Sequence, residues 1–303
     1  MCFRIWTVCG AVFGLSQSLM ALELDHGYGE SSFKFLKLSL SPRSMALGGS
    51  GAALLEGIGD ADLNPASAAR DSGSLAMGQG YPSQASAAGS HVSWNIPWQN
   101  RRITLHARYL GYSDIPGYDG LGRPTAGYGA HTLKFQAGIA GTLFGFAYGV
   151  STAFAQNNIA DADYGTGLLN AGIQRDLPWG LSAGLSVINA DYWTSSALDG
   201  SILFPPTSIQ AGLAYARSFP AESRLSLALD ARTRNDEQLC FPAGIEAAWK
   251  ETLMLRIGFP FGEPEPSVSA GLGLRWSRFG FNYAYQGHAV MVPGHYWNLE
   301  IRY

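Results

Sequence analysis

The final nine residues of the chain, HYWNLEIRY, constrain its fold more than any other stretch. In an extended strand, Trp297, Leu299, Ile301 and Tyr303 lie on one side, and the residues between them lie on the other. A soluble protein rarely ends on a clean apolar face that nothing covers. In a transmembrane β-barrel such a face points into lipid, because lipid-facing and lumen-facing residues alternate along every strand. The ending therefore predicts the last strand of an outer-membrane barrel.

The same alternation runs from about residue 73 to the end of the chain and predicts about fourteen antiparallel strands. We expect them at residues 74–80, 86–97, 102–112, 131–141, 143–156, 164–176, 180–190, 206–217, 223–233, 240–250, 252–261, 267–277, 279–288 and 294–303. The connections alternate between tight turns and longer loops, as expected for periplasmic turns and outside loops. A soluble β-sandwich or propeller would also alternate, but it explains neither the terminal strand nor the loop lengths. The predicted fold class is an all-β, antiparallel outer-membrane β-barrel with an N-terminal plug segment, and the predicted barrel is residues 73–303.

Composition and the N-terminus fit an exported membrane protein. Only 14% of residues are charged, the mean hydropathy is +0.01 and the net charge is −3, with no basic stripe for nucleic acid. Residues 1–21 resemble a secretory signal with cleavage near Ala21, the alternative being a short membrane anchor. Removal of the signal would leave Cys240 alone, so no disulfide framework is expected. We expect export to the bacterial outer membrane.

Two motifs lie in the predicted plug segment, residues 22–72. RSMALGG occupies residues 43–49, and NPA occupies residues 64–66. Together they resemble the PorV/PorQ family of outer-membrane proteins, within the FadL-like superfamily of long-chain fatty-acid transporters. The resemblance implies an N-terminal plug that enters a fourteen-stranded barrel, with its plug motif at Arg43, Gly48, Gly49, Asn64, Pro65 and Ala66. Glycines at 48 and 49 would let the backbone pass close to the barrel wall, and Asn64 with Pro65 would begin a helical turn.

Charged and polar residues on the inward side of the strands are the candidate lumen residues. They are Arg102, His106, Arg108, Arg224, Asp230, Arg232, Glu246, Arg256 and Arg275. They could form a polar conduit or a clasp for the plug. They could also be mutually satisfied pairs that fill the lumen, which is the usual state of buried charges.

The sequence contains no catalytic or metal-binding constellation that spacing supports. Asp60 with Asp62, and Asp161 with Asp163, could ligate Ca²⁺, but the other ligands of a calcium loop are missing. Solvated loop acids are the simpler interpretation. We therefore expect no enzyme activity, cofactor or metal.

Three functions follow from these observations. The first is a secretion-linked barrel of the PorV/PorQ type that docks secretion-system proteins. The second is a FadL-like channel that lets small hydrophobic molecules enter or leave sideways. The third, an outer-membrane enzyme, lacks a catalytic arrangement. In each case outer-membrane lipid surrounds the barrel, and the ligand and the partner are not specified by the sequence.

Overall fold

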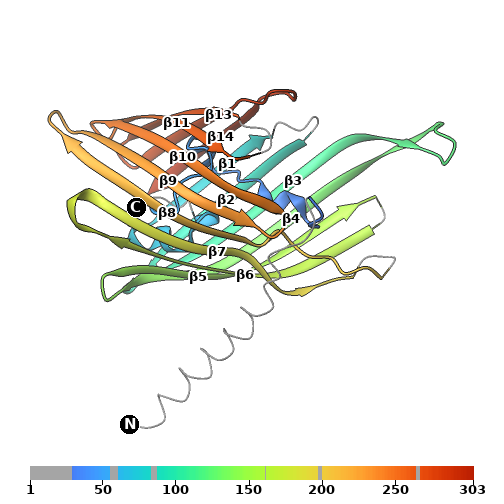
Figure 1. Cartoon of the computed structure of the whole chain (residues 1–303), viewed down its shortest axis with the longest axis horizontal. Helices are drawn as coiled ribbons and strands as arrows, with labels where there is room; N and C mark the ends of the chain where they lie inside the picture. Colours follow the sequence, from blue (N-terminus) through green and yellow to red (C-terminus); the bar gives the residue numbers. More distant parts are fainter. Residues whose placement is uncertain (1–28, 55–60, 83–86, 161, 197–199, 264–266) are drawn as a thin grey trace, which may run out of the picture.

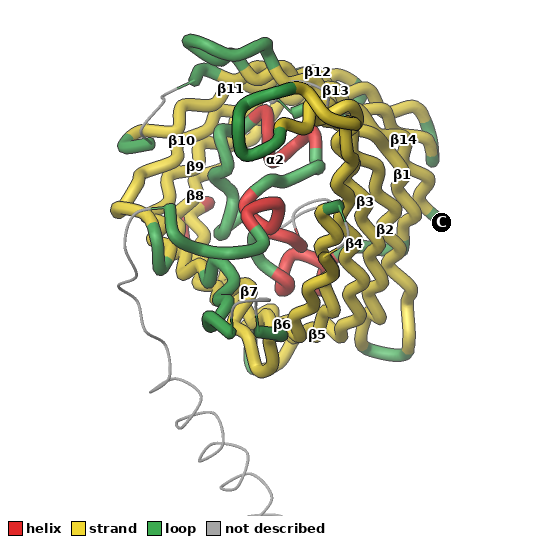
Figure 2. Tube along the Cα trace, turned by 90° about the vertical axis from the view of Figure 1, so that its right-hand side faces the viewer, coloured by secondary structure: helices red, strands yellow, loops and turns green. Residues whose placement is uncertain are grey.

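The chain forms a closed barrel. The computed structural model describes residues 29–54, 61–82, 87–160, 162–196, 200–263 and 267–303. Within them, fourteen antiparallel strands pair in chain order, and β1 closes the barrel against β14 (Figure 1, Figure 2). The strands are β1 (Ser74–Tyr81), β2 (Ala87–Trp98), β3 (Arg101–Tyr118), β4 (Pro124–Leu143), β5 (Phe146–Ile159), β6 (Ala162–Asp176), β7 (Leu181–Thr194), β8 (Ser208–Phe219), β9 (Ser223–Arg234), β10 (Glu237–Trp249), β11 (Leu253–Phe261), β12 (Ser269–Trp276), β13 (Phe279–Gln286) and β14 (Gly294–Arg302). The predicted barrel of fourteen antiparallel strands is confirmed, and the predicted signal peptide lies outside the described residues.

The C-terminal strand has the two faces that its sequence predicts. It pairs with β1 from Ser74↔Arg302 to Tyr81↔His295. Leu299 is 51% exposed on the outer surface, whereas Tyr296 is fully buried inside the barrel. Elsewhere on the outer surface, Val92, Trp94, Phe135 and Phe154 are among the residues that line an apolar groove of about 560 Å³. This exterior suits a barrel surrounded by lipid.

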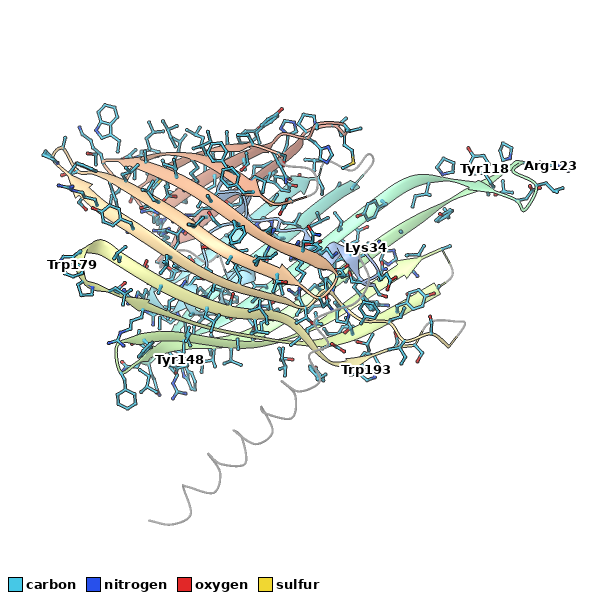
Figure 3. All side chains as sticks on the ribbon, in the orientation of Figure 1. Lys34, Tyr118, Arg123, Tyr148, Trp179 and Trp193 are labelled. Atoms are coloured by element: carbon cyan, nitrogen blue, oxygen red, sulfur yellow. The ribbon has the colours of Figure 1, made fainter. Side chains whose placement is uncertain are left out.

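Several connections differ from the prediction. Residues 113–130 were expected to form a loop, but β3 and β4 continue as a hairpin that extends beyond the barrel, with Tyr118 and Arg123 near its tip (Figure 3). The expected loops at residues 157–163 and 233–238 are much shorter, because their flanking strands extend into them. The predicted turn at 141–142 lies instead at Phe144 and Gly145, both with positive φ. Strands that pair beyond the hydrocarbon layer are held by backbone hydrogen bonds and need no apolar face towards lipid. Their sequences therefore show no apolar alternation by which these extensions could be predicted.

The two ends of the barrel differ in the lengths of their strand connections. We call the end with the longest connection, residues 195–207, the outer end, and we call the end at which all turns are short the inner end. The short helix η4 (Pro178–Gly180) lies in an inner turn, where Figure 3 shows Trp179.

The N-terminal part of the chain lies inside the barrel (Figure 2). We call residues 29–54 and 61–72 the luminal segment. It contains the helices η1 (Lys34–Lys37), α2 (Pro42–Ala46) and η3 (Pro65–Arg70). None of the described helices is long and apolar enough to span a membrane. The segment packs on the inner wall, for example where Leu40 and Ala46 meet Ala284 and Tyr296.

A row of inward-facing glycines lets the luminal segment lie directly against the wall. Three pairs in this row are neighbours in the sheet: Gly149↔Gly172, Gly184↔Gly212 and Gly244↔Gly258. A Cβ atom at any of them would overlap the luminal segment or a side chain that binds it. We call the full set the glycine belt: Gly149, Gly172, Gly184, Gly212, Gly244, Gly258 and Gly271. At the glycine belt the backbone of the luminal segment packs directly against the backbone of the wall, with no wall side chain between them.

Candidate functional site

Among the described residues, the luminal segment lines three larger cavities inside the barrel. The outer-rim pocket, of about 420 Å³, lies between residues 31–35 and the outer ends of β3 to β6. The outer chamber, of about 270 Å³, lies on the outer side of α2. The inner chamber, of about 80 Å³, lies near the inner turns. These cavities are the candidate sites.

The outer-rim pocket is mainly apolar. Phe33 and Phe35 of the luminal segment face Tyr112, Ile159 and Tyr164 on the wall, with Leu203 from the β7–β8 connection completing the lining. That connection is attached to the luminal segment, because Ser32 N donates a hydrogen bond of 2.8 Å to Phe204 O. The segment and the connection together form a small apolar recess at the outer end.

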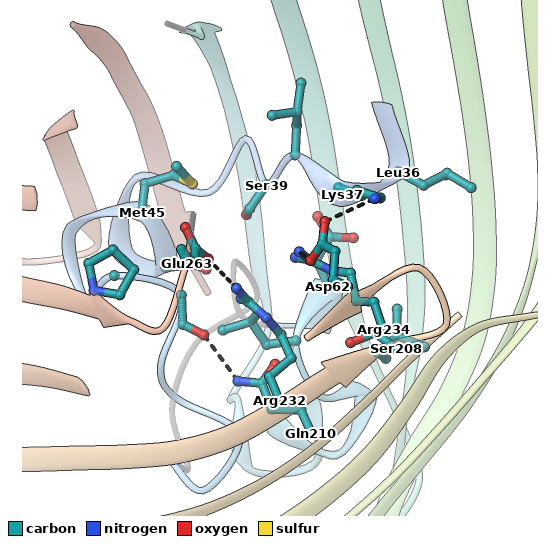
Figure 4. A pocket seen from close by; sticks show the side chains of 18 of the residues that line it. Leu36, Lys37, Ser39, Met45, Asp62, Ser208, Gln210, Arg232, Arg234 and Glu263 are labelled. Atoms are coloured by element: carbon teal, nitrogen blue, oxygen red, sulfur yellow. Dashed lines mark hydrogen bonds and ion pairs between the residues drawn. The ribbon is translucent and has the colours of Figure 1, made fainter. Parts of the chain in front are cut away.

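The outer chamber is lined by charges that pair across it (Figure 4). Lys37 Nζ lies 2.6 Å from Asp236 Oδ2 and 2.9 Å from Glu237 Oε1. Arg232 pairs with Glu263, and Arg234 pairs with Glu237. Several of these ion pairs join the luminal segment or the outer loops to the wall. They therefore position the segment, and the two charges within each pair neutralise each other.

Asp62 of the luminal segment is held between two cations of the wall. Its Oδ2 accepts a hydrogen bond of 3.3 Å from Arg108 Nη1, and its Oδ1 lies 3.8 Å from Lys134 Nζ. Burial opposes the ionisation of Asp62, but the charges of Arg108 and Lys134 outweigh that cost and hold the pKa of Asp62 at about 2. The interpretation of Asp62 as a solvated loop acid is wrong, because the carboxylate is enclosed by its partners. Among the described residues there is no group of three His, Cys, Asp or Glu side chains that could hold a metal ion.

Acid will weaken the attachment of the luminal segment. The pKa of Asp62 is lowered from its ordinary value of 3.8, so the stabilisation is complete above about pH 4 and is lost as the pH falls towards 2. We expect about 2 kcal/mol of unfolding free energy to be lost over this range. The measurement is the denaturant midpoint of the detergent-solubilised protein against pH. Asp62→Asn should lack this part of the pH dependence, and an unchanged acid profile in that variant would contradict the assignment.

The inner chamber contains the charged contact between α2 and the wall. Arg43 Nε and Nη2 donate to Glu246 Oε2 and Oε1, each over 3.1 Å. Arg256 Nε donates to the same Glu246 Oε2 over 2.7 Å, and its Nη1 donates to Asn282 Oδ1 over 2.9 Å. A two-bond Arg–carboxylate pair is among the stronger polar contacts in proteins. We call the Arg43–Glu246 contact the latch.

The other motif residues of the luminal segment lie at tight contacts. Gly48 and Gly49 have φ of +66° and +79°, and a Cβ at Gly48 would come within 2.8 Å of Phe259 N. Asn64 caps η3: its side chain accepts from Ala66 N over 3.0 Å and donates to Ala52 O over 2.8 Å. Pro65 occupies the first helical position, where its lack of an N–H has no cost. These contacts fold the segment and hold it against the belt.

The remaining predicted lumen residues occupy different levels of the barrel. Arg102 Nε donates to Asp71 O, and His106 hydrogen-bonds Ser93 Oγ over 2.9 Å. Asp230 accepts from Gly51 N and Ala52 N over 2.8 and 2.9 Å, which fixes the turn after α2. Arg224 and Arg275 line the inner chamber. The structure therefore does not gather the nine residues into one site.

Several wall residues that bind the luminal segment are uncharged, and sequence reasoning missed them. Gln174 donates to Ala52 O and Leu54 O, and Ser186 donates to Leu63 O. Polar residues at inward positions were visible in the sequence, but their partners are main-chain carbonyls that no motif marks. The recurring inward glycines were the one sequence signal that could have located the segment's path.

Comparison with known proteins shows the fold. No protein-family model matches this sequence, and a search of curated proteins found no match. The toluene transporter TodX of Pseudomonas putida is similar in structure, with a TM-score of 0.60, 11% identity, and 90% of this chain and 96% of that chain covered. The toluene transporter TbuX of Ralstonia pickettii gives a TM-score of 0.57 at 12% identity, covering 87% and 98%. A FadL homologue of Pseudomonas aeruginosa gives 0.54 at 8% identity, covering 88% and 98%. The barrel therefore has the fold of these FadL-type proteins, two of which are toluene transporters.

Proposed function

We propose that this protein is a FadL-type outer-membrane channel that admits small hydrophobic molecules at its outer end. The outer-rim pocket is the observation that carries the proposal. Its volume of about 420 Å³ falls within the range of small-molecule sites, and aromatic and aliphatic side chains dominate its lining. The similarity in fold to toluene transporters supports the same function. A secretory signal at residues 1–21 would deliver the chain to the outer membrane.

An apolar seam continues from the pocket along the wall. Phe35 and Thr132 line both the pocket and a narrow space of about 10 Å³ below it. Leu38, Leu40 and Leu110 line that space. Arg108 also lines the narrow space, which must widen before a hydrophobic solute can enter it. The solute would then contact mainly apolar side chains there, whereas the outer chamber would expose it to several ion pairs. The seam is thus the favoured path for such a solute.

A side chain that fills the pocket should stop uptake. Ala130 of β4 lines the pocket, whereas Ala126 of the same strand is exposed on the protruding part of the hairpin. We expect expression in a Gram-negative host to increase entry of the apolar dye N-phenyl-1-naphthylamine, measured by fluorescence. Ala130→Trp should reduce that increase about tenfold, because the indole would occupy the pocket. Ala126→Trp should change the increase by less than about twofold. Equal uptake by both variants, or no increase with the unmodified protein, would reject the channel.

Docking of secretion-system proteins, as the PorV/PorQ resemblance implies, remains a second candidate. The β3–β4 hairpin favours it, because the hairpin extends past the barrel and carries Tyr118 and Leu121 at 65% and 76% exposure (Figure 3). Exposed aromatic and aliphatic side chains at a tip are suited to a protein contact. Replacing residues 116–126 with a two-residue turn would separate the candidates. Docking predicts the loss of co-purifying secretion proteins, and the channel predicts unchanged dye entry.

A further inference from the structure

Three exposed arginines at the inner end of the barrel lie over the faces of phenylalanine rings. Each guanidinium carbon is close enough to a ring centre for the attraction between a cation and the face of an aromatic ring. We call these residues the rim arginines: Arg175 over Phe146 at 4.5 Å, Arg217 over Phe219 at 5.4 Å and Arg278 over Phe279 at 5.3 Å.

The same stack is built by three different backbone arrangements. Arg175 lies opposite its phenylalanine in the β5–β6 ladder. Arg217 precedes its phenylalanine by two positions on β8, so both side chains point to the same face of the sheet. Arg278 directly precedes its phenylalanine at the β12–β13 turn. The stack is therefore not a by-product of one kind of turn, and its recurrence at one end of the barrel indicates a shared role.

The rim arginines belong to the surface of the barrel that faces lipid. Arg175 continues the outward row of β6 that includes Ile173, and Arg217 continues the outward row of β8 that includes Leu213, both of which are exposed. The three phenylalanines under the arginines are also exposed large hydrophobic residues. A long cationic side chain at the end of an apolar row keeps its aliphatic part on the wall and places its charge among the lipid headgroups. Each guanidinium therefore lies where the headgroups of the inner leaflet begin.

No acid of the described residues forms an ion pair with a rim arginine. Asp176 is next to Arg175 in the chain, but it lies on the other side of β6 and pairs with Arg70. Stacking covers one face of the guanidinium and leaves the N–H donors at its edge directed away from the ring. This fork of donors matches two oxygens of a phosphate group. The rim arginines thus have the geometry of phosphate sites at the level of the headgroups.

We propose that the rim arginines bind the phosphate groups of anionic phospholipids, such as phosphatidylglycerol, in the leaflet at the inner end of the barrel. The acyl chains of the bound lipids lie along the phenylalanines and the apolar outward rows. A net negative headgroup is preferred over a zwitterionic one, because the choline of phosphatidylcholine carries a positive charge close to the same phosphate. This surface is on the outside of the barrel, so lipid binding there does not depend on the transport of hydrophobic molecules.

Native mass spectrometry of the protein in detergent, with equal amounts of dioleoyl-phosphatidylglycerol and dioleoyl-phosphatidylcholine, tests the proposal. The two lipids differ in mass, so the ratio of their adducts for the first bound lipid measures the preference. We expect the unmodified protein to favour phosphatidylglycerol about fivefold. The triple variant Arg175→Gln, Arg217→Gln and Arg278→Gln should favour it less than about twofold, because its headgroup sites carry no charge.

Arg123→Gln is the control for the loss of an exposed arginine elsewhere. Arg123 lies near the tip of the β3–β4 hairpin, beyond the barrel, so its removal should change the preference by less than about 1.5-fold (Figure 3). If the triple variant does not fold, Arg175→Gln combined with Arg278→Gln should lower the preference about twofold, since one of three sites remains. The proposal fails if the unmodified protein shows no preference, if the triple variant keeps more than half of it, or if Arg123→Gln lowers it as much. None of these results bears on dye entry, so failure of this proposal and failure of the hydrophobic channel are distinguishable.

Discussion

Substituting Asp62 by Asn will loosen the luminal segment by about 2–3 kcal/mol, close to the loss expected when its carboxylate is protonated, because it leaves buried cations without their acid. Arg108 and Lys134 approach Asp62 from neighbouring strands, and Lys134 is only 3% exposed. An amide of the same shape keeps the packing but cannot offset the two positive charges. Hydrogen exchange in residues 44–54 of the detergent-solubilised protein measures the loss, which should appear as exchange faster by about thirtyfold or more.

Two further variants separate this effect from a general loss of stability. Asp163→Asn makes the same change at an exposed acid of β6, which accepts from Asn158 Nδ2 over 2.9 Å, and should cost less than about 1 kcal/mol. Combining Asp62→Asn with Lys134→Met should recover part of the loss, because it removes one uncompensated cation. If Asp62→Asn exchanges no faster than Asp163→Asn, the carboxylate does not anchor the segment.

The barrel could be predicted because lipid imposes a rule on the sequence. Every strand that crosses the hydrocarbon layer must present apolar side chains outward and can present small or polar ones inward. The pattern in the last nine residues is a direct consequence, and it places Leu299 outside and Tyr296 inside. Beyond the lipid the rule no longer applies, which is why the hairpin from Ile115 to Tyr128 was expected to be a loop.

The cavities could not be predicted, because they depend on how the luminal segment meets the wall. Strand parity places Glu246 and Arg256 on the inward side, but it cannot indicate that Arg43, about two hundred positions away in the chain, binds the same carboxylate. Likewise, the spacing of Asp60 and Asp62 favoured solvated acids or a cation site, because nothing in the spacing shows that the partners of Asp62 lie on distant strands. Asp60 and Asp161 lie outside the described residues.

The glycine belt itself is open to a direct test at Gly172, where a single added methyl group should unseat the segment. A Cβ at Gly172 would overlap Asn64 Oδ1, and Asn64 is fully buried with hydrogen bonds to Ala66 N, Ala52 O and Ile173 O. Because the cap can move only by breaking these bonds, Gly172→Ala should cost about 2–4 kcal/mol. Exchange in residues 61–70 should then be faster by about thirtyfold or more, while the strands keep their protection.

Gly129→Ala is the matched substitution without the overlap. The nearest atom to a Cβ at Gly129 is Tyr112 O at 3.5 Å, which is an ordinary contact. Alanine also restricts the unfolded chain, so this variant should be neutral or slightly stabilising. If Gly172→Ala behaves like Gly129→Ala, the luminal segment can shift along the wall without a loss of unfolding free energy. The glycine belt would then not fix the position of the segment. If only Gly172→Ala releases residues 61–70, close contact with the belt is what fixes that part of the segment against the wall.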